Sequence, residues 1–217
     1  MKPLNKYIDH TILKPFAQKE DVVRVCREAK QYDFASVCIN AGYITLAREL
    51  LEGSSVKVCT VIGFPLGATS TAAKAAETEQ AYFDGCDEFD MVINIGKLKD
   101  QQYDYVRRDI EAVVKAAKGH CVKVIIETDL LTEEEKVMAV RLSCEAGATF
   151  VKTCTGFTAG KATVEDVKLM KANVTGGVQV KASAGIRSYE DAMKLIEAGA
   201  DRLGTSAGIA IIEGLNR

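Results

Sequence analysis

Two lysines stand inside apolar runs that are typical of buried strands. The stretch TFVKTCTG (149–156) places Lys152 among strand-forming residues, and VQVKASAG (178–185) repeats the layout with Lys181. Strand interiors seldom hold a lysine, because burying an ammonium group without a partner is costly. A charge at a strand end that reaches solvent explains one such lysine, but it explains a pair less well. We therefore favour a chemical role for Lys152 and Lys181.

The pair of lysines suggests carbonyl chemistry. If both face inward on neighbouring strands, their amines come close, because such strands lie about 4.8 Å apart. Two ammonium groups in a partly desolvated pocket disfavour each other's charge, so we expect a lowered pKa for at least one of them. A lysine that is neutral near pH 7 attacks carbonyls and forms a Schiff base. The iminium is an electron sink for breaking an adjacent carbon–carbon bond, and a carboxylate such as Asp90 is suited to move the protons.

These lysines need a scaffold, and the chain alternates strand-like runs with amphipathic stretches. Several runs are apolar almost throughout, as strands buried on both faces of a parallel sheet are. The predicted strands are 7–11, 35–40, 56–63, 88–94, 122–128, 149–155, 178–183 and 201–206. The first predicted strand is short and charged. We include it because the other seven strands favour a fold with eight.

The stretches between the strands carry helix signals. Apolar residues share one face in two of them: Val22, Val23, Cys26 and Ala29 in 19–33, and Val106, Ile110, Val113, Val114 and Ala117 in 104–119. Thr132 and Glu135 have the spacing of a capping box, and Ser188 is predicted to cap a later helix.

The order of these elements predicts an α/β fold, a (β/α)₈ barrel, with an open doubly wound sheet as the alternative. Three helices finish in similar phrases before the next strand, FDGCDEF, EAGATF and EAGADRL, which indicates one repeated unit. No G-x-G-x-x-G follows an early strand, which disfavours a dinucleotide-binding open sheet. The chain has no proline-rich linker or charge block, so we expect a single domain over 1–217.

Composition narrows the partners and the compartment. The net charge of −2 and the pI of about 5.8 argue against nucleic acid or an anionic membrane as a partner. Seven cysteines without a CxxC pair favour reduced thiols in the cytoplasm. With two histidines and no Cys/His cluster at metal-site spacing, we expect neither a metal nor another cofactor.

Glycine-rich segments follow the last two predicted strands. The first, SAGIRS, contains Ser183, Gly185 and Arg187, and the second, GTSAG, contains Gly204 and Ser206. Loops after strands seven and eight of such barrels habitually bind phosphate through backbone N–H groups and helix N-termini. Each segment alone is a weak signal, but together they predict a phosphate site.

Eight segments, in order and across nearly the whole chain, resemble one family. They are IDHTILKP, FASVCIN, VIGFPLG, DEFDMVINIG, IIET, FVKTCTGF, VKASAGIR and RLGTSAG, and they resemble the deoxyribose-phosphate aldolases. The resemblance implies a class I aldolase on a TIM barrel. Such an enzyme reversibly cleaves 2-deoxy-D-ribose 5-phosphate to D-glyceraldehyde 3-phosphate and acetaldehyde without a metal.

The resemblance also implies roles for individual residues. Lys152 is then the Schiff-base lysine, Lys181 its partner in tuning and proton relay, and Asp90 the relay carboxylate. The predicted substrate-binding residues are Asp9, Cys38, Thr153, Thr155, Gly156, Ser183, Ala184, Gly185, Arg187, Gly204 and Ser206.

Some positions depart from the family pattern or stay open. Ala184 stands where the family usually has the first glycine of the phosphate loop, and a positive φ there would be strained. Cys154 replaces a common serine, with little expected consequence. Glu127 is either a partner for one of the lysines or a charge at a strand end.

Two other functions compete with this interpretation. One is another Schiff-base or phosphate-binding barrel, such as a transaldolase-like or ketose-bisphosphate aldolase protein. The other is a non-catalytic barrel that binds a phosphosugar, which the presence of both lysines and Asp90 disfavours. In each case the partner is a small phosphosugar. We expect a homodimer, because two-fold dimers are the commonest assembly.

Overall fold

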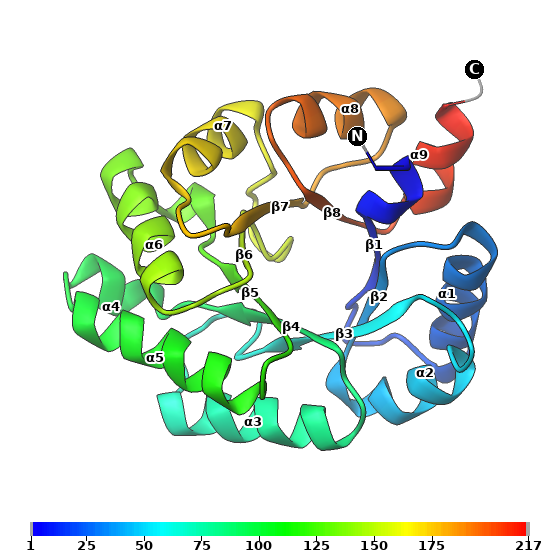
Figure 1. Cartoon of the computed structure of the whole chain (residues 1–217), viewed down its shortest axis with the longest axis horizontal. Coiled ribbons are helices and arrows are strands. Elements are labelled where there is room, and N and C mark those ends of the chain that lie inside the picture. Colours follow the sequence, from blue (N-terminus) through cyan, green and yellow to red (C-terminus); the bar gives the residue numbers. More distant parts are fainter. Residues whose placement is uncertain (1, 216–217) are drawn as a thin grey trace.

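The computed structural model describes residues 2–215, which wrap eight strands into a closed barrel (Figure 1). The strands are β1 (Ile8–Ile12), β2 (Ser36–Ile39), β3 (Lys57–Ile62), β4 (Glu88–Val92), β5 (Cys121–Ile125), β6 (Phe150–Lys152), β7 (Gln179–Ser183) and β8 (Arg202–Thr205). Neighbours in the chain pair in parallel, and β1 pairs with β8 to close the ring. The predicted (β/α)₈ barrel and its eight strands are confirmed, and the open-sheet alternative is wrong.

Helices form a ring around the barrel, as Figure 1 shows. They are α1 (Lys19–Tyr32), α2 (Ile44–Leu50), α3 (Thr71–Phe83), α4 (Ile95–Lys99), α5 (Tyr103–Ala116), α6 (Glu133–Glu145), α7 (Val164–Asn173), α8 (Tyr189–Glu197) and α9 (Gly208–Gly214), with 3-10 turns at Leu4–Tyr7, Ala41–Tyr43 and Thr128–Leu130. None of the helices within residues 2–215 has the length and hydropathy needed to cross a bilayer.

The predicted helix signals hold with one correction. Thr132 caps α6 through a complete capping box with Glu135, and Ser188 caps α8 in the same way. On α1 the fully buried valines are Val22 and Val25, whereas Val23 is only partly buried. The face that packs on the barrel is therefore turned slightly from the predicted one.

Alternation along β4 explains how a charged residue can stand in a buried strand. Phe89 and Met91 belong to the apolar core, while Glu88 and Asp90 contact charged groups of other strands. Successive side chains of a strand point to opposite faces, so the apolar pair faces the helices and the acidic pair faces the barrel interior. The barrel interior is thus partly filled with charge, which is why β1 is buried although its sequence contains Asp9.

A buried ion pair joins α3 to α5 in the ring of helices outside the barrel. Lys74 Nζ lies 2.5 Å from Asp109 Oδ2 and donates to the carbonyl of Val92 at 2.8 Å, and both charged side chains are fully buried. Removing one member of such a pair leaves an uncompensated buried charge. We expect Asp109→Ala to lower the free energy of unfolding by about 3–5 kcal/mol in denaturant titrations.

The matched control for this prediction is Asp104→Ala, at an exposed position in the first turn of the same helix. Its expected change is within about 0.5 kcal/mol, as for most surface substitutions. Similar small losses for both variants would show that the buried pair contributes little.

Candidate active site

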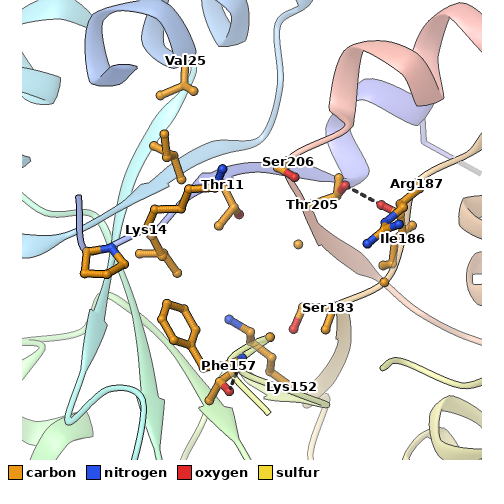
Figure 2. A pocket seen from close by; sticks show the side chains of 18 of the residues that line it. Thr11, Lys14, Val25, Lys152, Phe157, Ser183, Ile186, Arg187, Thr205 and Ser206 are labelled. Carbon is orange, nitrogen blue, oxygen red and sulfur yellow. Dashed lines mark hydrogen bonds between the residues drawn. The ribbon is translucent and has the colours of Figure 1, made fainter. Parts of the chain in front are cut away.

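A pocket of about 530 Å³ opens at the carboxyl ends of the barrel strands (Figure 2). Its lining comes from the last residues of β1, β6, β7 and β8, where Thr11, Lys152, Ser183 and Gly204 lie, and from the segments that follow these strands. Catalytic residues of this fold sit at the same end, because the βα loops meet there. This pocket is therefore the candidate active site.

Three lysines converge on Asp90 at the floor of the pocket. Its Oδ2 accepts hydrogen bonds from Lys152 Nζ at 2.9 Å and Lys181 Nζ at 2.7 Å. Its Oδ1 accepts one from Lys123 Nζ at 2.8 Å. Lys152 and Lys181 are direct register partners on β6 and β7, as the doubled sequence pattern suggested. The structure therefore brings the two lysines and Asp90 together.

The charges of this cluster differ from the expected ones. Burial alone would lower the pKa of Lys181, but the carboxylates of Asp9 and Asp90 outweigh burial and raise it. Burial likewise opposes the charge of Asp90, yet three ammonium groups hold its pKa well below the usual range. The expectation that lysine–lysine repulsion lowers a pKa is wrong for Lys181, because two buried carboxylates neutralise it. Lys181 is therefore held as an ammonium group beside Lys152.

A second layer of charge lies beneath this floor. Arg202 binds Asp9 Oδ1 at 2.6 Å and Glu88 Oε1 at 3.1 Å, and Lys123 lies 2.6 Å from Glu88 Oε2. Lys181 Nζ also lies 2.5 Å from Asp9 Oδ2. Together with Asp90 and Lys152, the cluster has four basic side chains and three carboxylates. The cluster therefore contains one more basic side chain than carboxylates.

Two thiols also lie near Asp90, which the spacing of the sequence did not reveal. Cys38, Cys59 and Asp90 place potential ligand atoms within 4.8 Å of one another. Burial raises the pKa of the Cys59 thiol well above its usual value, so it is not a thiolate. Asp90 already binds three ammonium groups, which would repel a metal cation. Cys59 and Asp90 are thus poorly suited to a metal, although the three potential ligands lie together and a hydrogen bond with Cys59 lowers the pKa of the Cys38 thiol.

The predicted substrate-binding residues fall into two groups. Eight line the pocket: Thr155, Gly156, Ser183, Ala184, Gly185, Arg187, Gly204 and Ser206. Asp9, Cys38 and Thr153 are fully buried and do not line it. Asp9 and Cys38 belong to the buried layers under the floor, and the hydroxyl of Thr153 ties β6 to the backbone of Ser183 on β7.

The glycine-rich end of the pocket has tight geometry. Ala184 has φ 80°, so the strain expected at this departure from glycine is present. A Cβ on Gly204 would lie 2.9 Å from Ser183 Cβ and 3.1 Å from Lys181 Cε. Gly204 therefore leaves room for the Lys181 side chain. The start of α8 is occupied by its own Asp191, which accepts from the N–H groups of Arg187 and Ser188.

With this geometry in place, comparisons with known proteins identify the family. Residues 4–214 match a family described as "DeoC/LacD family aldolase". The chain belongs to the DeoC/LacD aldolase family. It is 60% identical to the deoxyribose-phosphate aldolase of Streptococcus sanguinis over 97% of this chain and 96% of that protein. It is 59% identical to that of Finegoldia magna over 97% and 99%.

Solved structures agree with the family assignment. A structure described as "QR15, an Aldolase" has a TM-score of 0.94 at 41% identity, covering 100% of this chain and 97% of that one. The tetrameric deoxyribose phosphate aldolase of Aeropyrum pernix has a TM-score of 0.91 at 36% identity, covering 98% and 91%. Membership of this aldolase family removes the transaldolase-like alternative.

Several site residues of this aldolase escaped sequence reasoning. Lys123 stands in VKVIIE, the same apolar–lysine–apolar pattern as the other two lysines, so a signal was present. Glu88 precedes Asp90 by two residues, and period-two alternation places both on one face. Lys14, which stands within IDHTILKP, and Arg24 also line the pocket, and neither was assigned a role from the sequence.

Proposed function

We propose that this protein reversibly cleaves 2-deoxy-D-ribose 5-phosphate to D-glyceraldehyde 3-phosphate and acetaldehyde through a Schiff base on Lys152. The observation that carries the proposal is the shared contact of Lys152 and Lys181 with one buried oxygen of Asp90 at the pocket floor. The substrate is that in the name of the family relatives, deoxyribose-phosphate aldolases.

Among the basic side chains of the cluster, Lys152 is the one that lines the pocket. The other lysines of the cluster, Lys123 and Lys181, are fully buried, whereas Lys152 lines the pocket and keeps a small exposed fraction. Lys152 is therefore the lysine of the cluster that can meet an aldehyde in the pocket. A neutral amine is the nucleophile that Schiff-base formation requires.

The bond changes follow from this amine. Lys152 attacks the C1 aldehyde of the open-chain sugar, and loss of water leaves an iminium. The iminium accepts the electron pair of the C2–C3 bond while the C3 hydroxyl loses its proton and becomes the aldehyde of glyceraldehyde 3-phosphate. The enamine left on Lys152 then takes a proton at C2, and water releases acetaldehyde and the free amine.

Asp90 and Lys181 supply the proton transfers. The raised pKa of Lys181 and the lowered pKa of Asp90 keep the resting proton on the ammonium group, with the carboxylate as its acceptor. Asp90 Oδ2 contacts both Lys181 and Lys152, so it joins the proton store to the reacting nitrogen. General acid–base catalysis of this kind contributes roughly 10²–10⁴ to a rate.

The phosphate binds at the end of the pocket formed by Gly185, Arg187 and Ser206. Figure 2 places Arg187 and Ser206 apart from Lys152, across the pocket. Binding energy from this remote group would orient the sugar over Lys152, so its loss should lower turnover as well as affinity. Unphosphorylated 2-deoxyribose should therefore be a poor substrate on both counts, and inorganic phosphate should compete weakly.

Ser206→Asp tests this phosphate site. A carboxylate in the loop repels the phosphate, so kcat/KM for the phosphorylated sugar is expected to fall at least about tenfold. Ser206→Asn is the neutral control of equal size. Activity on 2-deoxyribose without phosphate should change little in either variant. Equal losses with both sugars in Ser206→Asp would place the phosphate elsewhere.

Product analysis tests the proposed reaction itself. The protein is incubated with 2-deoxy-D-ribose 5-phosphate, and the two aldehydes are identified by chromatography and mass spectrometry. We expect D-glyceraldehyde 3-phosphate and acetaldehyde in equal amounts, and formation of the sugar phosphate when both are supplied. Binding of the sugar phosphate without turnover would instead support a non-catalytic phosphosugar-binding barrel.

The proposal extends to organisation and location. The chain acts as one catalytic domain over 1–217, and it functions as a homodimer in the cytoplasm. Seven free cysteines, five of them buried, support a reducing compartment. One related aldolase, from Aeropyrum pernix, is described as a tetramer. Light scattering measures the mass of the assembly, and a mass of four chains would contradict the proposed dimer.

A further inference from the structure

Glu127 has an unusual backbone conformation at the carboxyl end of β5. It lies just before the 3-10 turn Thr128–Leu130 and has φ 56° and ψ 70°, in the left-handed region. Such a conformation is uncommon for a residue with a side chain and calls for compensating contacts. The glutamate is buried, so its carboxylate needs hydrogen-bond donors.

Those donors come from the segment 153–163, which follows β6 and is named here the β6–α7 loop. Glu127 Oε1 accepts from the backbone N–H of Thr155 at 3.0 Å, and Oε2 accepts from the hydroxyl of the same residue. Thr158 Oγ1 adds a longer contact to Oε1 at 3.4 Å. Both alternatives considered from the sequence are therefore wrong: Glu127 binds threonines of this loop, neither pairing with a lysine nor reaching into solvent.

The loop fixed in this way forms one wall of the pocket. The hydroxyl of Thr155 accepts from the N–H of Phe157, so the carboxylate, Thr155 and Phe157 form a chain of hydrogen bonds. Phe157 and Gly156 line the pocket, and Figure 2 shows Phe157 beside Lys152. The Phe157 ring also meets the ring of Phe64, which follows β3, edge-on with centroids 5.1 Å apart.

These contacts indicate a role for the carboxylate of Glu127, which takes no part in the charged cluster. We propose that Glu127 is a positioning residue: its carboxylate holds Thr155 and thereby places Gly156 and Phe157 as the wall that orients the sugar phosphate above Lys152. The inference rests on the proposed aldolase function. It assigns Glu127 no contact with the reacting atoms, and it gives the Thr155 hydroxyl a structural role in the wall.

The role requires two acceptor atoms on one side chain. A carboxylate accepts from both the N–H and the O–H of Thr155, whereas an amide offers one acceptor and one donor group. Glu127→Gln keeps the shape and one of the two bonds, so it should rescue part of what Glu127→Ala loses. Thr155→Val removes the hydroxyl at nearly constant shape and so breaks the chain from the other side.

The experiment compares two reactions of each variant. One is kcat and KM for 2-deoxy-D-ribose 5-phosphate, and the other is the rate at which acetaldehyde and borohydride trap the protein. Acetaldehyde needs only the amine and its relay, whereas the five-carbon phosphosugar also needs the wall. For Glu127→Ala we expect kcat/KM to fall at least about tenfold, mainly through KM, with the trapping rate within about threefold of wild type.

A double variant tests whether Glu127 and Thr155 act together, and this comparison does not depend on the effect of one substitution alone. If Glu127 acts through Thr155, the double variant Glu127→Gln/Thr155→Val should be no more than about twofold worse than the worse single variant. Circular dichroism at the assay temperature checks that each variant is folded. Should Glu127→Ala fail to fold, Glu127→Gln and Thr155→Val give the same comparison.

The outcomes separate the two proposals. Equal loss of trapping and of kcat/KM, or multiplicative effects in the double variant, would overturn the positioning role. A wild-type protein that acetaldehyde and borohydride do not trap would contradict the proposed aldolase function itself.

Discussion

Replacing Lys152 with alanine is expected to lower kcat for cleavage of 2-deoxy-D-ribose 5-phosphate by at least about a thousandfold. The reason is that Lys152 is the cluster's lysine on the pocket wall, while Lys123 and Lys181 are fully buried and bound to carboxylates. Neither of them can replace the missing amine. The measurement is the steady-state rate of aldehyde production.

The control is Lys168→Ala, which removes an exposed lysine of α7 and should leave the rate unchanged. Lys152→Ala removes a hydrogen-bond partner of Asp90, so the fold of the variant is checked by its thermal unfolding curve. Wild-type activity, or normal trapping by acetaldehyde and borohydride in this variant, would move the Schiff base to another residue.

Asp90→Asn is expected to damage both turnover and stability. The amide can no longer balance the three ammonium groups that contact this side chain, and it breaks the link between Lys181 and Lys152. We expect kcat to fall at least about a hundredfold, the contribution typical of general acid–base catalysis. Unfolding free energy should fall by about 3–5 kcal/mol, because buried cations lose their partner.

Treating the wild-type protein with EDTA distinguishes proton transfer by Asp90 from metal binding by Asp90. If Asp90 relays protons, EDTA leaves wild-type activity unchanged. Inhibition by EDTA that a divalent ion reverses would show that Asp90, with Cys38 and Cys59 beside it, holds a metal after all. A near-normal kcat in Asp90→Asn would contradict its role in the relay.

The fold could be predicted because its signals are local. Apolar runs, capping residues such as Thr132 and repeated helix ends each depend on a few neighbouring residues, and they placed all eight strands. The paired lysines were visible for the same reason, since each interrupts its own strand. The correction on α1, from Val23 to Val25, reflects how the helix packs on the barrel, which no local pattern specifies.

The interior of the barrel could be predicted less well, because it depends on which strands meet across it. Arg202 and Glu88 stand at the starts of β8 and β4, where a charged residue normally reaches solvent, yet they bind each other. Asp9 was expected to line the pocket, but it lies one layer below the surface that substrate reaches. Depth along the barrel axis follows from strand register, which the sequence does not show.

Glu127 illustrates a different limit. Its partners lie 28 residues further along the chain and include a backbone N–H, which is present at every non-proline residue and carries no sequence signal. Its backbone lies in the left-handed region, two residues beyond the end of β5. Strand alternation therefore gives no guide to where this carboxylate points.

Trapping the wild-type protein with acetaldehyde and borohydride, followed by peptide mapping, tests the central claim most directly. Reduction converts the iminium into a stable ethyl group on the amine that formed it. We predict one ethyl group per chain, carried by the peptide that contains Lys152. An unmodified chain, or an ethyl group on a lysine outside the pocket, would contradict the account.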